Sequence, residues 1–172
     1  MNDTTNAPAA AAPGPVAGMA ITFIVLLVII GWIALGLQFL ADTSLFGGFL
    51  LLWFWATCEQ LDFRRLPVAI AGALVGIFLA WFIVFAAAKW GGAGLAAGIG
   101  LLVLELYMDV IKAVPLLING STMLYLTVAA APLIQLHVNW LELVLSTVVG
   151  GVFFGLVVEG LKRLAARFAP AG

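Results

Sequence analysis

The sequence predicts an all-helical, polytopic membrane helix bundle, because it is strongly apolar, contains long apolar stretches and places its few basic residues mostly on one side of them. Of its 172 residues, 65% are hydrophobic and only 9% are charged, whereas about 25% of the residues of a soluble domain are charged. At this length we expect one transmembrane helical domain, residues 16–168. Residues 1–15 are rich in Ala and Pro and are predicted to form a disordered cytoplasmic tail.

The number of crossings follows from the length of the apolar stretches. About 20 apolar residues span the hydrocarbon core of a bilayer. Four stretches meet this length, namely residues 16–41, 66–88, 93–113 and 140–161. Two shorter stretches lie between them, residues 45–58 and roughly 116–136. Counting all of these predicts six crossings, two of which are short or broken helices.

The basic residues provide a test of this number, since Lys and Arg concentrate in cytoplasmic loops. With six crossings and a cytoplasmic N-terminus, only Lys89 falls on the outer side. The cytoplasmic side receives Arg64, Arg65, Lys112, Lys162, Arg163 and Arg167. Six crossings with both termini cytoplasmic therefore satisfy the rule.

Six crossings divide into three and three, and an odd-numbered unit repeated in tandem must be inverted. A shift of 75 residues places "VAIAGALVGIFLAW" over "LVLSTVVGGVFFGL", so that Gly76 aligns with Gly151 and Phe78 with Phe153. The same shift places "SLFGGF" over "NGSTML", and the two short stretches coincide. Short or interrupted segments in corresponding positions of two halves indicate a transporter site. The sequence thus raises the possibility of a 3+3 inverted repeat.

Small residues on the long helices predict close packing. Three pairs of glycines lie four residues apart and so share a helix face, which lets backbones approach closely in lipid. They are Gly72 and Gly76, Gly94 and Gly98, and Gly151 and Gly155. We expect these faces to form a tight bundle or a homo-oligomer. The lipid bilayer is the other predicted partner, and the net charge of −1 gives no indication of nucleic acid.

The stretch "GLAAGIGLLVLELYMDVIK" carries two carboxylates within an otherwise apolar helix. The spacing of Gly94, Gly98, Glu105 and Asp109 places all four on one stripe. Asp109 is expected to form an ion pair with Lys112, three residues further on. Glu105 lies deeper, where an ionisable residue usually has a function. The alternative is a carboxyl group that is kept neutral by burial or is bonded to a neighbouring helix.

The run "INGST" in the short stretch 116–136 can also be interpreted as functional or as structural. A helix over residues 122–136 has a length of about 22 Å, too short to cross. A crossing must include the preceding "PLLI", which places Asn119 and Gly120 within the bilayer. Either a half-helix directs its N-terminus at a solute, or Asn119 or Ser121 caps an ordinary helix start. The predicted substrate path consists of Gly47, Gly48, Glu105, Asn119, Gly120, Ser121 and Thr122, and these residues should approach one another near the midplane.

The sequence contains no recognisable enzyme signature. One His and one Cys are too few for the usual zinc sites, and motifs of hydrolases, metalloproteases and nucleotide-binding loops are missing. We therefore predict no catalytic residue, no metal and no cofactor. The predicted function is a small-solute channel or transporter. The alternative is a non-catalytic accessory or structural subunit of a larger membrane complex.

One family shows a similar order of features. These are "LFGGFLLLWFWATC", a helix rich in small residues, and a further helix that ends before "VPLLINGSTMLYLTVAAAP", between Ser44 and Pro132. In this half of the chain the sequence resembles the YcdZ-like family of small uncharacterised bacterial inner-membrane proteins. The resemblance implies a helical membrane fold in the bacterial inner membrane, and it implies no site residues.

Overall fold

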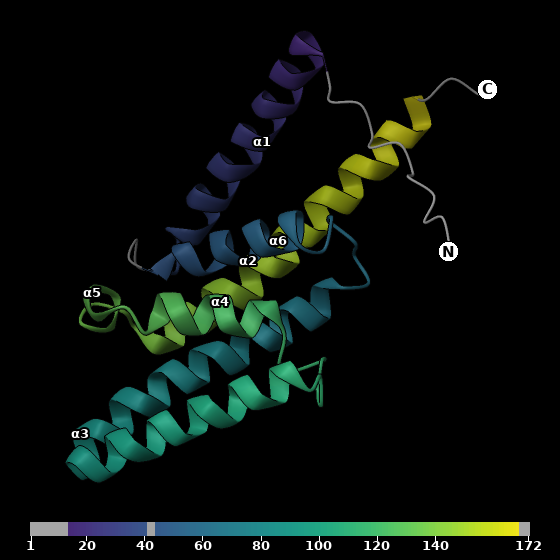
Figure 1. Ribbon diagram of the computed structural model, residues 1–172. Coiled ribbons are helices and arrows are strands. Elements are labelled where there is room, and N and C mark those ends of the chain that lie inside the picture. The colour runs from purple at the N-terminus through teal and green to yellow at the C-terminus, as the bar shows by residue number, and fades with distance from the viewer. Residues whose placement is uncertain (1–13, 41–43, 169–172) are drawn as a thin grey trace, which may run out of the picture.

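All regular secondary structure in the described part of the chain, residues 14–40 and 44–168, is helical in the computed structural model (Figure 1). The helices are α1 (Pro15–Gly36), α2 (Phe46–Thr57), α3 (Leu66–Val110), α4 (Gly120–Ala129), α5 (Pro132–Gln135) and α6 (Trp140–Phe168). The predicted disordered tail lies almost entirely outside the described residues. The all-helical fold class is confirmed for the residues that the structure describes.

Three described helices are long and apolar enough to cross a membrane: α1, α3 and α6. The predicted number of six is therefore not supported by helix length. The 12 residues of α2 and the 10 residues of α4 extend only about 18 and 15 Å, roughly half of the hydrocarbon core. The stretch 116–136 is not one helix, because α4 ends ahead of Pro132 and the residue before a proline disfavours helical backbone.

The longest helix, α3, is folded back on itself. Gly91 has φ of 56° and ψ of −132°, a backbone conformation that is essentially limited to glycine. Figure 1 shows the two arms of α3 side by side. A Cβ added to Gly94 would overlap the carbonyl oxygen of Ala86, and one added to Gly98 would lie 3.1 Å from the Ile83 side chain. We call residues 66–90 the first arm and residues 92–110 the second arm; they correspond to two separate predicted stretches.

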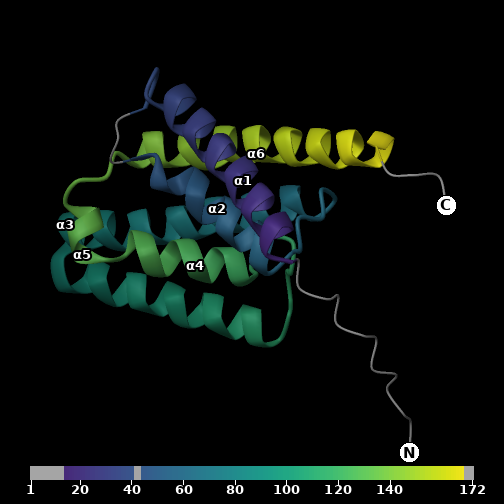
Figure 2. The ribbon, with the colours of Figure 1, turned by 90° about the horizontal axis from the view of Figure 1, so that it is seen from above.

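The helices occur twice in the same order of long, short and long. The first unit consists of α1, α2 and the first arm, and the second of the second arm, α4 and α6. A shift of 75 residues moves the first unit's helices to 90–111, 121–132 and 141–165, close to the second unit's 92–110, 120–129 and 140–168. Figures 1 and 2 show each helix of the second unit running opposite to its counterpart. Within the described ranges, the order of helix lengths thus recurs, and corresponding helices run in opposite directions.

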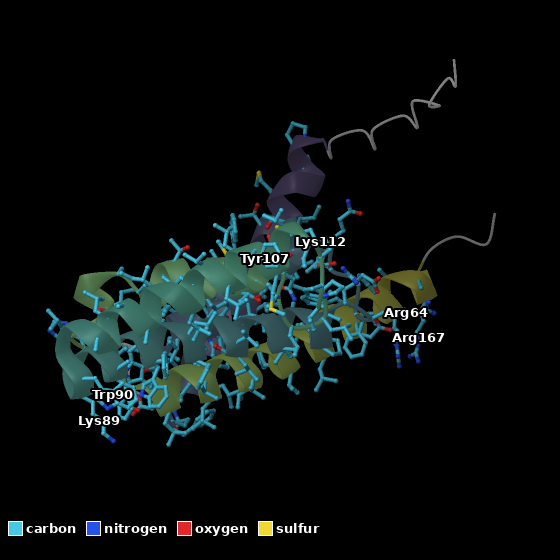
Figure 3. The ribbon with its side chains drawn as sticks, turned by 60° about the horizontal axis from the view of Figure 1, so that its bottom comes forward. Arg64, Lys89, Trp90, Tyr107, Lys112 and Arg167 are labelled. Carbon is cyan, nitrogen blue, oxygen red and sulfur yellow. The ribbon has the colours of Figure 1, made fainter. Side chains whose placement is uncertain are left out.

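The connections between these segments alternate between the two ends of the bundle. Figure 3 places Lys89 and Trp90 at one end and Arg64, Lys112 and Arg167 at the other. Lys162 belongs with the second group, because its Nζ donates a hydrogen bond of 2.6 Å to the carbonyl oxygen of Leu61. We call these the Trp90 end and the basic end.

The core lies between α2, α4, α6 and the first arm of α3. Its fully buried members include Leu51, Trp55, Tyr125 and Leu143. Helix α1 is inclined to the others in Figures 1 and 2. Its Trp32 is buried, and the ring centroid lies 5.6 Å from that of Phe154 and 5.9 Å from that of Phe153 on α6.

The glycine-rich faces are occupied within the chain. Gly72 and Gly76 contact α4, and Gly94 and Gly98 contact the first arm. Gly151 and Gly155 lie against side chains of α2, the first arm and the loop before it. Close packing at these six glycines is therefore intramolecular. A homo-oligomer through the same faces stays a prediction.

Candidate functional site

The "INGST" run forms a complete capping box at the start of α4. The Asn119 side chain accepts a hydrogen bond of 2.9 Å from the backbone N–H of Ser121. The Thr122 hydroxyl accepts one of 3.1 Å from the backbone N–H of Asn119 and donates one of 2.8 Å to the carbonyl oxygen of Leu117. Such reciprocal bonds satisfy N–H groups that a helix start leaves without partners. The hydrogen bonds therefore favour the interpretation of Asn119 as a helix cap.

Asn119 also ties α4 to the first arm of α3. Its Nδ2 donates to the carbonyl oxygens of Val68 and Pro115, each at 3.3 Å. A Cβ at Gly72 would overlap the amide group of Asn119. Glycine at this position lets the first arm approach the cap directly, and both the oxygen and the nitrogen of the amide have partners.

The start of α2 is satisfied by a different helix. The Ser146 hydroxyl on α6 accepts a hydrogen bond of 3.1 Å from the backbone N–H of Gly48. It donates one of 3.3 Å to the carbonyl oxygen of Leu45. The Tyr125 hydroxyl on α4 donates to the carbonyl oxygen of Gly47. Gly47 is packed so closely on α6 that an added Cβ would lie 2.9 Å from the Thr147 hydroxyl.

The structure does not bring the starts of the two short helices together. Phe54 of α2 lies over Gly120: a Cβ added to Gly120 would be 3.0 Å from the Phe54 ring. Phe54 lies two turns, about 10 Å, further along α2 than Gly47. The cause is that α2 and α4 run antiparallel (Figure 1), which places their N-termini at opposite ends of the pair. The predicted path is thus divided into Gly47 and Gly48 at one level and residues 119–122 at another.

Glu105 lies buried within the hairpin of α3. Its residue is only 4% exposed, and its Oε1 has no hydrogen-bond partner among the described residues. The contacts of Gly94 with Ala86 and of Gly98 with Ile83 set the antiparallel register, which continues to about Gly76 opposite Glu105. Gly76 in turn contacts the backbone of α4. This register places Glu105 at about the level of the α4 start.

Asp109 has the role that the spacing predicts. It accepts a hydrogen bond of 3.0 Å from Lys112 in an exposed ion pair. Within the described ranges, no three His, Cys, Asp or Glu side chains lie together as a metal site would require.

Three residues of this region were not among the predicted path residues: Tyr125, Ser146 and Thr147. All three are fully buried, and the Tyr125 hydroxyl donates a hydrogen bond to the carbonyl oxygen of Gly47. A signal for Ser146 and Thr147 was present, since they form a polar pair within an apolar helix. Together with Ser44, Ser121 and Thr122 they make a set of buried polar residues around the two short helices.

Comparison with known proteins identified no matching family model, no matching curated protein and no matching solved structure.

Proposed function

We propose that this chain is a small-solute transporter of a bacterial inner membrane, built from two inverted three-helix units. The observation that carries the proposal is the antiparallel pair of short helices, α2 and α4, at corresponding positions of the two units. In inverted-repeat transporters the solute site lies between the repeats and is formed by short or discontinuous helices. The resemblance to the YcdZ-like family accounts for the choice of membrane.

Buried polar groups around the two short helices support a site there. The hydroxyl oxygens of Ser44 and Ser121 and Oε1 of Glu105 have no hydrogen-bond partner among the described residues. Ser44 precedes α2 and Ser121 is in the first turn of α4, so each short helix has one such atom near its start. A polar solute or water molecule that reaches these atoms gains hydrogen bonds that the protein itself does not supply.

For the orientation, we propose six passes with the basic end in the cytoplasm. In this proposal the short helices complete their passes with irregular backbone, which is tolerated at membrane depth where protein or a water-filled cavity lines it. Cysteine substitutions at Lys89 and Lys112, made in a Cys58→Ser background, test this orientation. We expect membrane-impermeant thiol reagents to label position 89 from the outside and position 112 from the inside; cytoplasmic labelling at 89 would contradict it.

Transport is tested with purified protein in liposomes, using stopped-flow light scattering for small neutral solutes and fluorescent dyes for protons and monovalent cations. We expect Glu105→Gln to change the flux or its pH dependence while the protein still folds. Asn119→Leu should reduce flux more severely, because it removes both a donor and an acceptor. Asp109→Asn is the matched control, since it changes a carboxylate on the same stripe that already has an ion-pair partner.

One observation favours the alternative, an accessory or structural subunit: the Asn119 cap is complete without any solute. In that case wild-type liposomes stay impermeable to every solute tested. Glu105→Gln is then silent, and Asn119→Leu lowers only the thermal stability. This combination of results would refute the transport proposal.

A further inference from the structure

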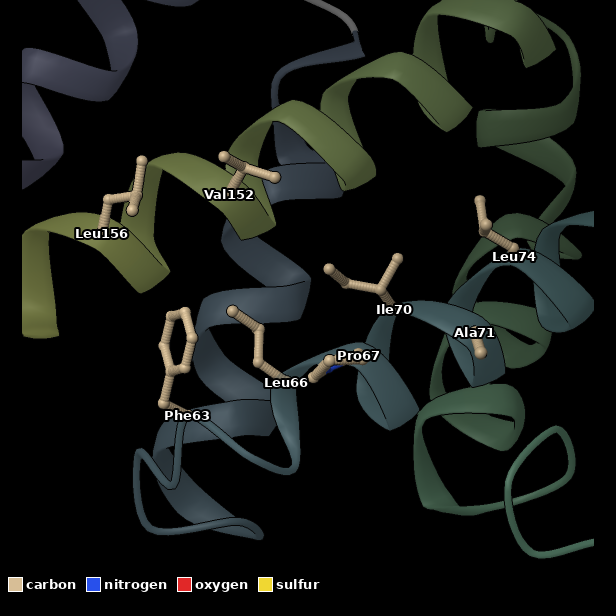
Figure 4. A pocket seen from close by; sticks show the side chains of 8 residues that line it. All are labelled: Phe63, Leu66, Pro67, Ile70, Ala71, Leu74, Val152 and Leu156. Carbon is tan, nitrogen blue, oxygen red and sulfur yellow. The ribbon is translucent and has the colours of Figure 1, made fainter.

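An apolar groove runs along the bundle between the first arm of α3 and α6. Nearer the basic end it encloses a volume of about 390 Å³, and Figure 4 shows Leu66 and Ile70 facing Val152 and Leu156 across it. Toward the Trp90 end it continues with a volume of about 490 Å³, lined by Ile77, Phe78, Trp81, Trp140, Leu141 and Val144. Leu74 lines both parts. We call them the basic half and the Trp half of the groove.

The two halves are counterparts under the 75-residue shift. Leu66 of the basic half corresponds to Leu141 of the Trp half, and Ile77 of the Trp half corresponds to Val152 of the basic half. Both are therefore built by equivalent positions of α3 and α6, with mainly apolar linings. They differ in the charges that lie beyond them.

Arginines extend the basic half toward the aqueous phase. On α6 the spacings from Val152 and Leu156 to Arg163 and Arg167 are four, seven and four residues, which places all four on one helix face. On the other wall, Arg64 follows the groove-lining Phe63. Figure 3 shows Arg64 and Arg167 at the same end of the molecule.

Two of these arginines lack an ion-pair partner among the described residues. Arg163 is paired with Glu159 at 2.9 Å, but Arg64 and Arg167 take part in no ion pair within the described ranges. Lys89 is the basic residue at the Trp90 end, and its Nζ lies over the rings of Phe85 and Trp90. The basic half thus combines an apolar channel with unpaired guanidinium groups at its mouth.

We propose that the basic half of the groove binds an anionic phospholipid, with an acyl chain along Leu66, Ile70 and Leu156 and the phosphate at Arg64 and Arg167. The volume is within the range of about 300–1,000 Å³ that small-molecule sites have. Arginine binds phosphate with two parallel hydrogen bonds, and basic pockets between helices on the cytoplasmic side bind anionic lipid headgroups. The proposal depends on the membrane placement and is independent of transport.

Native mass spectrometry of delipidated full-length protein in a mild detergent tests the site. The two probes are phosphatidylglycerol and phosphatidylcholine with identical acyl chains. Because each arginine near the membrane surface contributes a few-fold to the attraction of an anionic headgroup, we expect wild type to bind phosphatidylglycerol about tenfold more tightly. Glycerol phosphate, which has the anionic group without the chain, should not compete at equal concentration. Equal affinity for the two lipids, or competition by glycerol phosphate, would overturn the proposal.

Two sets of variants locate the site. Arg64→Gln combined with Arg167→Gln should abolish the preference for phosphatidylglycerol, whereas Lys89→Gln at the opposite end should retain it. Ala71→Phe fills the basic half and should weaken the binding of both lipids, whereas the matched Val144→Phe fills the Trp half and should not. Circular dichroism and gel filtration verify that each variant is folded. A double arginine variant that keeps the preference, or equal effects of the two phenylalanine variants, excludes this site.

Discussion

The short helices α2 and α4 occupy corresponding positions in the two units, yet their starts are stabilised in different ways. The start of α4 is capped by its own neighbours, with hydrogen bonds between Asn119, Ser121 and Thr122. The start of α2 receives its partner from Ser146, 98 residues away from Gly48. Both arrangements supply hydrogen-bond partners for backbone N–H groups of the first turn. Such partners must come from the protein, because water does not reach a helix start inside a bundle. The comparison shows that one requirement can be met by local sequence or by tertiary packing.

The equivalent glycines Gly76 and Gly151 differ in what they pack against. A Cβ at Gly76 would overlap the carbonyl oxygen of Thr122 and lie 2.9 Å from the backbone nitrogen of Leu126. At the equivalent Gly151 the nearest atoms belong to side chains, Leu51 at 2.6 Å and Ile70 at 2.9 Å. An added methyl group at Gly76 would therefore meet backbone of α4, whereas at Gly151 it would meet side chains that can rotate.

Of the substitutions that test this comparison, Gly76→Ala should lower the stability most. The added methyl group meets backbone atoms that can move only if all of α4 moves, and we expect the free energy of unfolding to fall by about 3 kcal/mol. Gly151→Ala should cost clearly less, about 1 kcal/mol, because side chains adjust more readily. Detergent-induced unfolding, followed by tryptophan fluorescence, measures both. Equal losses would mean that the two interfaces are packed alike.

Ser146→Ala tests the tertiary cap of α2. It leaves the buried N–H of Gly48 without its partner, and the cost of an unsatisfied buried donor is about 1–3 kcal/mol. The same unfolding assay applies, together with amide hydrogen exchange, which should accelerate at the start of α2 and stay unchanged at the start of α4. Thr127→Ala is the control, since it removes an exposed hydroxyl that bonds only to its own helix. If Ser146→Ala costs no more than this control, Gly48 has another partner.

Asn119→Ala should have the smallest effect of the three, about 1 kcal/mol, the usual cost of a lost N-cap. Because the cap is local, Asn119→Ser should restore most of the stability, since Ser also caps well. Hydrogen exchange at Ser121 provides the local measurement. A serine variant as unstable as the alanine variant would show that the bonds to Val68 and Pro115, and not the cap, are what α4 requires.

Much of this architecture was accessible from the sequence, because it depends on contacts over a few residues. Hydrophobic stretches predicted the positions of the long helices, and the spacing of Asp109 and Lys112 predicted their ion pair. The "INGST" run contained both partners of the α4 capping box. The 75-residue shift that aligns the two short stretches in the sequence also relates the bounds of the described helices; an inverted repeat stays a prediction.

Only the tertiary structure determined which helix faces pack against one another. The antiparallel packing of α2 against α4 separates Gly47 from Asn119, although the sequence suggested that they converge. The chain folds back at Gly91, and Glu105 on the second arm is buried in the folded chain. The bonds of Ser146 to Gly48 and of Tyr125 to Gly47 join residues 98 and 78 positions apart. Periodicity in the sequence reports the faces of each helix, but the pairing of those faces depends on packing over such distances, so it was settled only when the helices packed together.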